Sequence, residues 1–117
     1  MDIVTIKKEF KKRLLKEIEK VKELPVALSG GVDSGTIAAL SNPKFVISVK
    51  LPGGEKYNEI EYAKQVAIYI DKKHIVVEPN EEEFDEFVKE AVLAIGRPIP
   101  HFNIFPLFCM YKKLAEM

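Results

Sequence analysis

A short segment with two serines, two glycines and an aspartate is the part of this sequence best suited to chemistry. It reads Ser29-Gly30-Gly31-Val32-Asp33-Ser34 and follows an apolar run that ends at Leu28. Glycine adopts positive φ easily and has no Cβ to keep an anion away, and serine hydroxyls can donate hydrogen bonds. Between a strand and a helix, the free N–H groups of such a segment surround one point at the positive end of the helix dipole. The segment therefore predicts a phosphate-binding loop.

Asp33 is the residue of this loop that a phosphate would repel. A carboxylate is stable beside a polyphosphate when a divalent metal ion lies between the two, so Asp33 indicates such an ion. The spacing differs from that of the kinase and GTPase P-loop, which is longer and has a lysine before its final Ser or Thr. The alternative is a plain strand-to-helix corner in which the glycines make the turn and Asp33 caps the helix.

Apolar runs and helical stripes alternate along the chain and predict the elements that position the loop. Residues 3–21 form an amphipathic stripe, with apolar residues every three or four positions. Short apolar runs predict buried strands at 24–28, 45–49 and 74–77; the second is broken by the glycines at 53 and 54. The remaining helices are predicted at 35–41, at 60–70, from the cap at Asn80 to the prolines at 98 and 100, and from Pro106 onward.

This alternation of strands and helices implies a parallel sheet wound with right-handed crossovers. The predicted fold class is α/β, a three-layer doubly wound sandwich in a short version with about three strands. In such sheets ligands bind beyond the carboxyl ends of the strands, which is where the loop lies. We divide this single domain into an N-terminal amphipathic helix, 1–24, and a nucleotide-binding part, 25–117.

The composition of the 117 residues, 47% hydrophobic and 31% charged, is that of a soluble globular protein. Lys plus Arg and Asp plus Glu number 18 each, so the overall charge predicts neither a nucleic-acid nor a membrane partner. No apolar run approaches the ~20 residues of a membrane helix and no secretory signal is evident, so we expect a cytoplasmic location. The single cysteine, Cys109, lies in an apolar run that predicts a buried structural thiol.

The loop and its surroundings resemble the N-type ATP pyrophosphatases, whose signature is Ser-Gly-Gly-Val-Asp-Ser after an apolar strand. Within that superfamily the chain looks most like the synthetase domain of glutamine-dependent asparagine synthetase. The similarity continues through residues 45–53, Glu59, His74 and the helix that begins at Pro106. It covers nearly all of residues 25–117 and implies the fold of the adenine nucleotide alpha hydrolases.

The resemblance also implies roles for individual residues. The backbone at Leu28 and Val49 would frame the adenine of ATP, the pyrophosphate (PP) loop from Ser29 to Ser34 would hold the pyrophosphate, and Asp33 would ligate Mg²⁺. In that family ATP adenylates the carboxylate of a small substrate, and ammonia then displaces AMP. No residue here is a convincing general base: His74 is expected to be a core or rim histidine, and His101, in a loop, stays open to either role.

The chain departs from that family in ways that bear on function. The family carries a catalytic glutamate before its last helix, whereas residues 94–100 contain no acid. The family also has a fourth strand and a second pyrophosphate loop after that helix, whereas this sequence stops at Met117. We therefore expect the strand before the loop to have an uncovered edge. That edge predicts a fragment, half of a split protein, or a homo-oligomer or partner chain that covers it.

Three functions stay open on this basis. The first is an ATP-dependent ligase that adenylates a small carboxylate to form an amide. The second is a non-catalytic nucleotide-binding or partner module, which the missing glutamate favours. The third is a relative of the tRNA-modifying and sulfur-transferring enzymes, for which the lysines of residues 7–22 are the sole RNA surface and Cys109 is the sole thiol.

Overall fold

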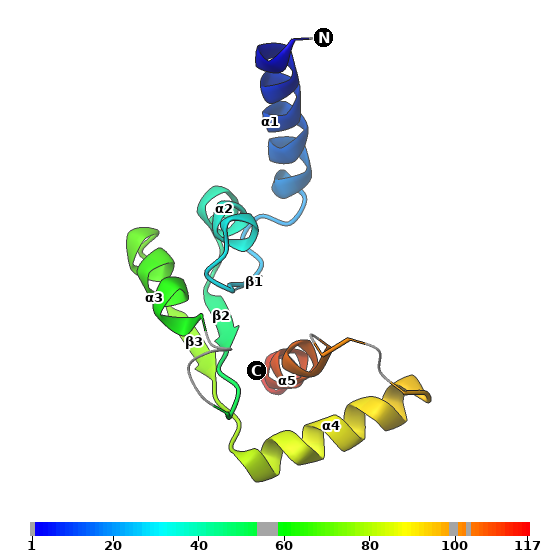
Figure 1. Ribbon diagram of the computed structural model, residues 1–117. Coiled ribbons are helices and arrows are strands. Elements are labelled where there is room, and N and C mark those ends of the chain that lie inside the picture. Colours follow the sequence, from blue (N-terminus) through cyan, green and yellow to red (C-terminus); the bar gives the residue numbers. More distant parts are fainter. Residues whose placement is uncertain (1, 54–58, 99–100, 103) are drawn as a thin grey trace.

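The computed structural model describes residues 2–53, 59–98, 101–102 and 104–117. Gly54 and Pro100, where we expected a strand and a helix to be interrupted, lie outside these residues. The elements, drawn in Figure 1, are α1 (Ile3–Glu19), β1 (Val26–Ala27), α2 (Val32–Ser41), β2 (Val46–Val49), α3 (Ile60–Tyr69), β3 (His74–Val77), α4 (Glu81–Ile95) and α5 (Ile104–Glu116).

The described strands form one parallel sheet in the order β1-β2-β3. Val46 of β2 is in register with Val26 of β1 and with His74 of β3. Helix α2 connects β1 to β2, and α3 connects β2 to β3. The predicted α/β class, with a parallel sheet of three strands in the described part of the chain, is confirmed.

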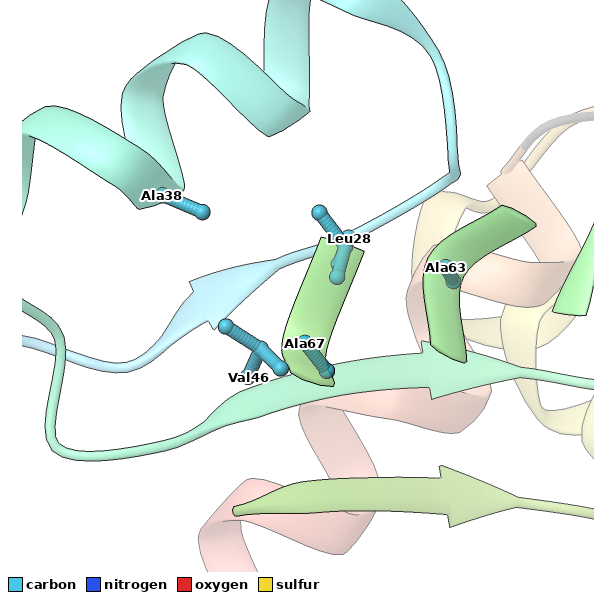
Figure 2. Close-up of a cluster of buried hydrophobic side chains, with 5 residues drawn as sticks. All are labelled: Leu28, Ala38, Val46, Ala63 and Ala67. Atoms are coloured by element: carbon cyan, nitrogen blue, oxygen red, sulfur yellow. The ribbon is translucent and has the colours of Figure 1, made fainter. Parts of the chain in front are cut away.

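Helices cover both faces of this sheet. On one face α2 and α3 pack small side chains against the strands, in a buried cluster of Leu28, Ala38, Val46, Ala63 and Ala67 (Figure 2). The next side chain of β2 after Val46 points to the opposite face, because side chains alternate along a strand. That face is covered by α5, which contacts β2 and β3, and α4 packs on α5 (Figure 1). The layers are those of the predicted sandwich.

The two C-terminal helices are joined by specific contacts. Helix α4 begins at a capping box in which the side chain of Asn80 accepts from Glu83 N, as the sequence predicted, and Gly96 is its C-cap. Lys112 of α5 forms an ion pair with Glu90 of α4 at 2.8 Å. Three aromatic rings pack at the junction of the helices: Phe84, Phe102 and Phe105.

Several predicted bounds differ from the structure. Helix α2 begins at Val32 rather than at residue 35, and its N-cap is Gly31, so Asp33 does not cap the helix as the alternative of a plain corner required. Strand β1 is limited to Val26–Ala27, because the chain before it contains Pro25, which has no N–H for a ladder. Helix α5 begins two residues before Pro106.

Helix α1 lies away from the sheet and contacts α2 (Figure 1). The predicted amphipathic helix is confirmed, but Ile18 is the one residue of α1 that is buried within the described chain. Ile3, Ile6 and Phe10 of the predicted apolar stripe are 68%, 50% and 65% exposed. None of the helices within the described ranges combines the length and the hydropathy that a membrane span needs. The division of the chain at residues 24 and 25 stays a prediction.

Candidate functional site

The predicted phosphate-binding loop joins the end of β1 to the start of α2. Leu28 continues the pairing of β1, since its N–H donates to the carbonyl of Ile47 at 2.8 Å, and only 3% of Leu28 is exposed. Gly30 has φ +86°, and Gly31 caps α2 without a side-chain hydrogen bond. The N–H groups of the first turn of α2 therefore lie at the loop, beyond the carboxyl end of the strand.

Gly30 lies where no side chain would fit. A Cβ at this position would be 2.7 Å from Tyr62 Cβ and 3.0 Å from the carbonyl oxygen of Glu59. Glu59 is the N-cap of α3, so the first turn of α3 packs directly against the loop. The N-terminal ends of two helices meet here, and the dipoles of both favour an anion at this position.

The polar groups of the loop are hydrogen-bonded to one another. Ser34 Oγ accepts from Ser29 N at 3.1 Å, and Ser29 Oγ accepts from Gly31 N at 3.3 Å. The two hydroxyl oxygens are 2.9 Å apart. Serine hydroxyls rotate to suit their partners, so the same groups can turn toward an anion. The loop is thus held in shape by the groups that we predicted to bind phosphate.

A cavity of about 380 Å³ lies beside the loop, at the carboxyl end of the sheet. It falls near the small end of the roughly 300–1,000 Å³ that ligand pockets occupy. Strands β1 and β2 provide one wall, the start of α3 provides a second, and α5 closes the site from the other face of the sheet. Glu59 is the one charged residue among the described lining residues, so the walls are mainly apolar.

All of the predicted site residues except Asp33 line one of two separate hollows. Four of them line the cavity: Leu28, Ser29, Ser34 and Val49. Three others line a separate groove of about 570 Å³ between α2 and α3: Gly30, Gly31 and Val32. Asp33 is exposed in the first turn of α2 and lines neither. The loop itself separates the two hollows.

Two parts of the cavity wall had not been assigned from the sequence. The first is the α5 wall, where Pro106, Leu107 and Met110 reach the cavity. The apolar run of α5 was visible in the sequence, but not the face that it would cover. The second is Ser48, a buried polar residue within the apolar strand β2. The signal for Ser48 in the sequence was a single hydroxyl side chain within an otherwise apolar strand.

Ser48 connects the loop to a histidine. Its Oγ donates to the carbonyl of Leu28, and it lies 2.8 Å from His74 Nε2 on β3. Burial, and the charge of Lys64 on α3, lower the pKa of His74 below its usual value. The expected core or rim position of His74 is confirmed, because its side chain is half-buried beside the sheet.

The residues present fit a nucleotide and a magnesium ion in chemical type. Mg²⁺ keeps several waters and is held by one or two carboxylates together with substrate phosphates, so the single carboxylate of Asp33 suits it. Among residues 2–53, 59–98, 101–102 and 104–117, no group of three His, Cys, Asp or Glu side chains could hold a metal alone. A metal site here would therefore depend on bound phosphate for its remaining ligands.

Comparison with known proteins gives one family, and six chains of solved structures are similar to this one. The family model for asparagine synthase matches residues 6–117. No curated protein matches the sequence. Among solved structures, an NH3-dependent NAD synthetase from Campylobacter jejuni subsp. jejuni NCTC 11168, in complex with the nitrate ion, is 19% identical with a TM-score of 0.47. The match covers 82% of this chain and 46% of that chain, so it spans less than half of the synthetase.

Proposed function

This chain belongs to the asparagine synthase family, and on that premise we propose that it binds ATP with Mg²⁺ and cleaves ATP between the α and β phosphates. The observation that carries the proposal is the glycine and serine loop at which the N-terminal ends of α2 and α3 meet beside a cavity. In this proposal the backbone at Leu28 and Val49 frames the adenine. The loop from Ser29 to Ser34 holds the pyrophosphate, and Asp33 ligates the metal.

The proposed reaction is adenylation of a small carboxylate, as a step toward an amide. A carboxylate oxygen attacks the α-phosphorus in line, the bond from that phosphorus to the bridging oxygen breaks, and pyrophosphate leaves. Backbone N–H groups of the loop and the two helix dipoles stabilise the charge that develops on pyrophosphate. The apolar walls from β2 and α5 exclude water from the reacting atoms. Mg²⁺, when bound, neutralises part of the phosphate charge.

A second candidate is a module that binds the nucleotide without turning it over. Two observations favour it. Glu59 is the single titratable side chain among the described residues of the cavity wall, and the chain after α4, Gly96 to Pro98, carries no acid. A sulfur-transfer function has less support, because Cys109 is 1% exposed and burial raises its pKa to about 11.

The metal-binding role can be measured by titrating ATP and Mg²⁺ into the protein by calorimetry. We expect Asp33→Ala to weaken Mg²⁺-dependent ATP binding about tenfold or more, because it removes a charged ligand. Asp85→Ala is the matched control, since it removes an exposed carboxylate from α4. Equal affinity for the Asp33→Ala variant and the unsubstituted protein would contradict the proposed role of Asp33.

Catalysis is tested by assaying pyrophosphate while the protein is incubated with ATP, Mg²⁺ and single amino acids that carry a second carboxylate. Release above the background of the Asp33→Ala variant supports the ligase, and the amino acid that stimulates it names the substrate. Tight ATP binding without release, with every amino acid tried, supports the binding module.

We also propose that a second copy of this chain covers the free edge of β1. In the described sheet β1 is an edge strand, and Ala27 is exposed on it. An open edge offers unpaired N–H and C=O groups to another chain. The exposed apolar side of α1 adds contact surface, and its lysines suit the acidic start of α4 in a second copy. A mass by light scattering that equals one chain at all concentrations would contradict this proposal.

A cytoplasmic location stays a prediction.

A further inference from the structure

A chain of hydrogen bonds crosses the sheet at the point where β1 passes into the phosphate loop. It runs from His74 Nε2 on β3 to Ser48 Oγ on β2, a distance of 2.8 Å, and from that hydroxyl to the carbonyl of Leu28. Ser48 is 4% exposed, so its hydroxyl is shielded from water. One side chain from the middle strand thus joins β3 to Leu28, the residue that follows β1.

The direction of these hydrogen bonds follows from the number of protons available. A carbonyl oxygen can only accept, so the single proton of Ser48 Oγ is directed at Leu28. Ser48 Oγ must then accept from His74, which requires a proton on His74 Nε2. Burial and the charge of Lys64 disfavour the doubly protonated ring. Near neutral pH, His74 is therefore neutral and has its proton on Nε2.

The peptide groups on both sides of Leu28 are each held by a hydrogen bond. The N–H of Leu28 donates to the carbonyl of Ile47 at 2.8 Å, and its carbonyl accepts from Ser48. Strand β1 contains two residues, so few ladder hydrogen bonds hold it in place. Ser29, whose N–H and hydroxyl both take part in the loop network, follows directly.

We propose that Ser48 and His74 are positioning residues, which hold the peptide between Leu28 and Ser29, and through it the loop of residues 29–34, in the geometry that receives phosphate. The part that concerns phosphate rests on the proposed function. Neither residue touches the reacting atoms in this role. A buried hydroxyl without partners costs free energy, whereas Ser48 has both a donor and an acceptor partner.

The chain offers a matched comparison within the same domain. Ser41, at the end of α2, is fully buried, and within the described residues its Oγ has no hydrogen-bond partner. Ser41→Ala therefore removes a buried hydroxyl without a partner among the described residues, whereas Ser48→Ala removes one that joins β2 to His74 and to the Leu28 carbonyl. Ser48→Thr keeps the hydroxyl on a side chain that suits a strand.

The first experiment needs no ligand. Nitrogen-15 NMR of the His74 ring at neutral pH is expected to show a protonated Nε2 and an unprotonated Nδ1. Amide exchange at Leu28, Ser29 and Gly31 is expected to rise about tenfold in Ser48→Ala, from loss of one hydrogen bond, and to stay near the original rate in Ser48→Thr and Ser41→Ala. A ring with its proton on Nδ1, or unchanged exchange in Ser48→Ala, overturns the proposal.

The second experiment measures Mg²⁺-dependent ATP affinity of the same variants. We expect about a tenfold loss for Ser48→Ala, recovery in Ser48→Thr, and no loss in Ser41→Ala. If Ser48→Ala does not fold, the pair His74→Gln and His74→Leu replaces it, because glutamine keeps an N–H donor and leucine does not. Equal affinity in that pair overturns the proposal. If the protein binds no ATP, the proposed function is wrong. The ring tautomer and the amide exchange then still decide whether the chain of hydrogen bonds holds the loop.

Discussion

Helices α2 and α3 differ from α1 in how the apolar side of each is used. Helices α2 and α3 pack alanines against the sheet, where Ala38, Ala63 and Ala67 are at most 2% exposed. Helix α1 has larger apolar residues, yet Phe10 is 65% exposed. Small side chains allow a helix backbone to approach a close-packed sheet, and the alanines of α2 and α3 lie where that approach is made. Periodicity predicted all three helices without making this distinction.

Gly30→Ala tests the close approach of α3 to the loop, and it has the largest expected effect. Positive φ, a clash with Tyr62 Cβ and tight contact with the backbone of Glu59 should lower the free energy of unfolding by roughly 2–5 kcal/mol. Gly96→Ala is the control, since Gly96 has a similar φ of +76° and open space around it. Thermal unfolding of both variants separates the clash from the strain. Equal losses would mean that α3 does not press on the loop.

Val46→Ala and Phe10→Ala compare the two kinds of surface directly. Val46 is 0% exposed, so its truncation should lower the free energy of unfolding by about 1–3 kcal/mol in denaturant titrations. Phe10→Ala should change it by less than about 0.5 kcal/mol in a single chain, because Phe10 is exposed. A larger, concentration-dependent effect of Phe10→Ala would show that another chain covers α1.

Substitutions at the N-caps of α4 and α1 also compare a packed helix with an exposed one, and their expected effects are smaller. The side chain of Asn80 accepts from Glu83 N at 2.8 Å at the start of α4, and that of Asp2 accepts from Thr5 N at 2.7 Å at the start of α1. Asn80→Ala should lower the free energy of unfolding by about 1 kcal/mol, because α4 packs on α5. Asp2→Ala should reduce helix content by circular dichroism and leave the global unfolding midpoint unchanged. A shift of the midpoint in Asp2→Ala would show that α1 is tied to the core.

The last and smallest effect concerns the reactivity of the Cys109 thiol. It is measured in the unsubstituted protein. Burial raises its pKa to about 11 from the ordinary 9.0, so the native thiol stays protonated at neutral pH and should resist iodoacetamide. Reactivity should appear as pH rises toward the raised pKa or when the protein is denatured. The denatured protein is the control for reagent quality. Fast labelling of the folded protein at neutral pH would contradict the buried position.

The sequence predicted the sheet, its crossovers and the loop because these depend on local patterns. The alternation of apolar runs indicated a parallel sheet, and the cap at Asn80 marked the start of α4 correctly. The order of strands and the wall from α5 depend on long-range packing, which local patterns do not contain. Helix α2 starts earlier than predicted because Gly31 caps it through the backbone. Ser48 and His74 are 26 positions apart, so their contact could not be read from spacing.

The hydrogen bonds among Ser29, Gly31 and Ser34 also bear on the heat of binding. A phosphate that enters the loop exchanges these hydrogen bonds for new ones instead of filling empty donors. The net enthalpy of that exchange is smaller than the number of new contacts suggests. Burial of the apolar cavity wall contributes a negative heat-capacity change. Calorimetry at several temperatures should therefore register the purine side of a nucleotide more clearly than its phosphates.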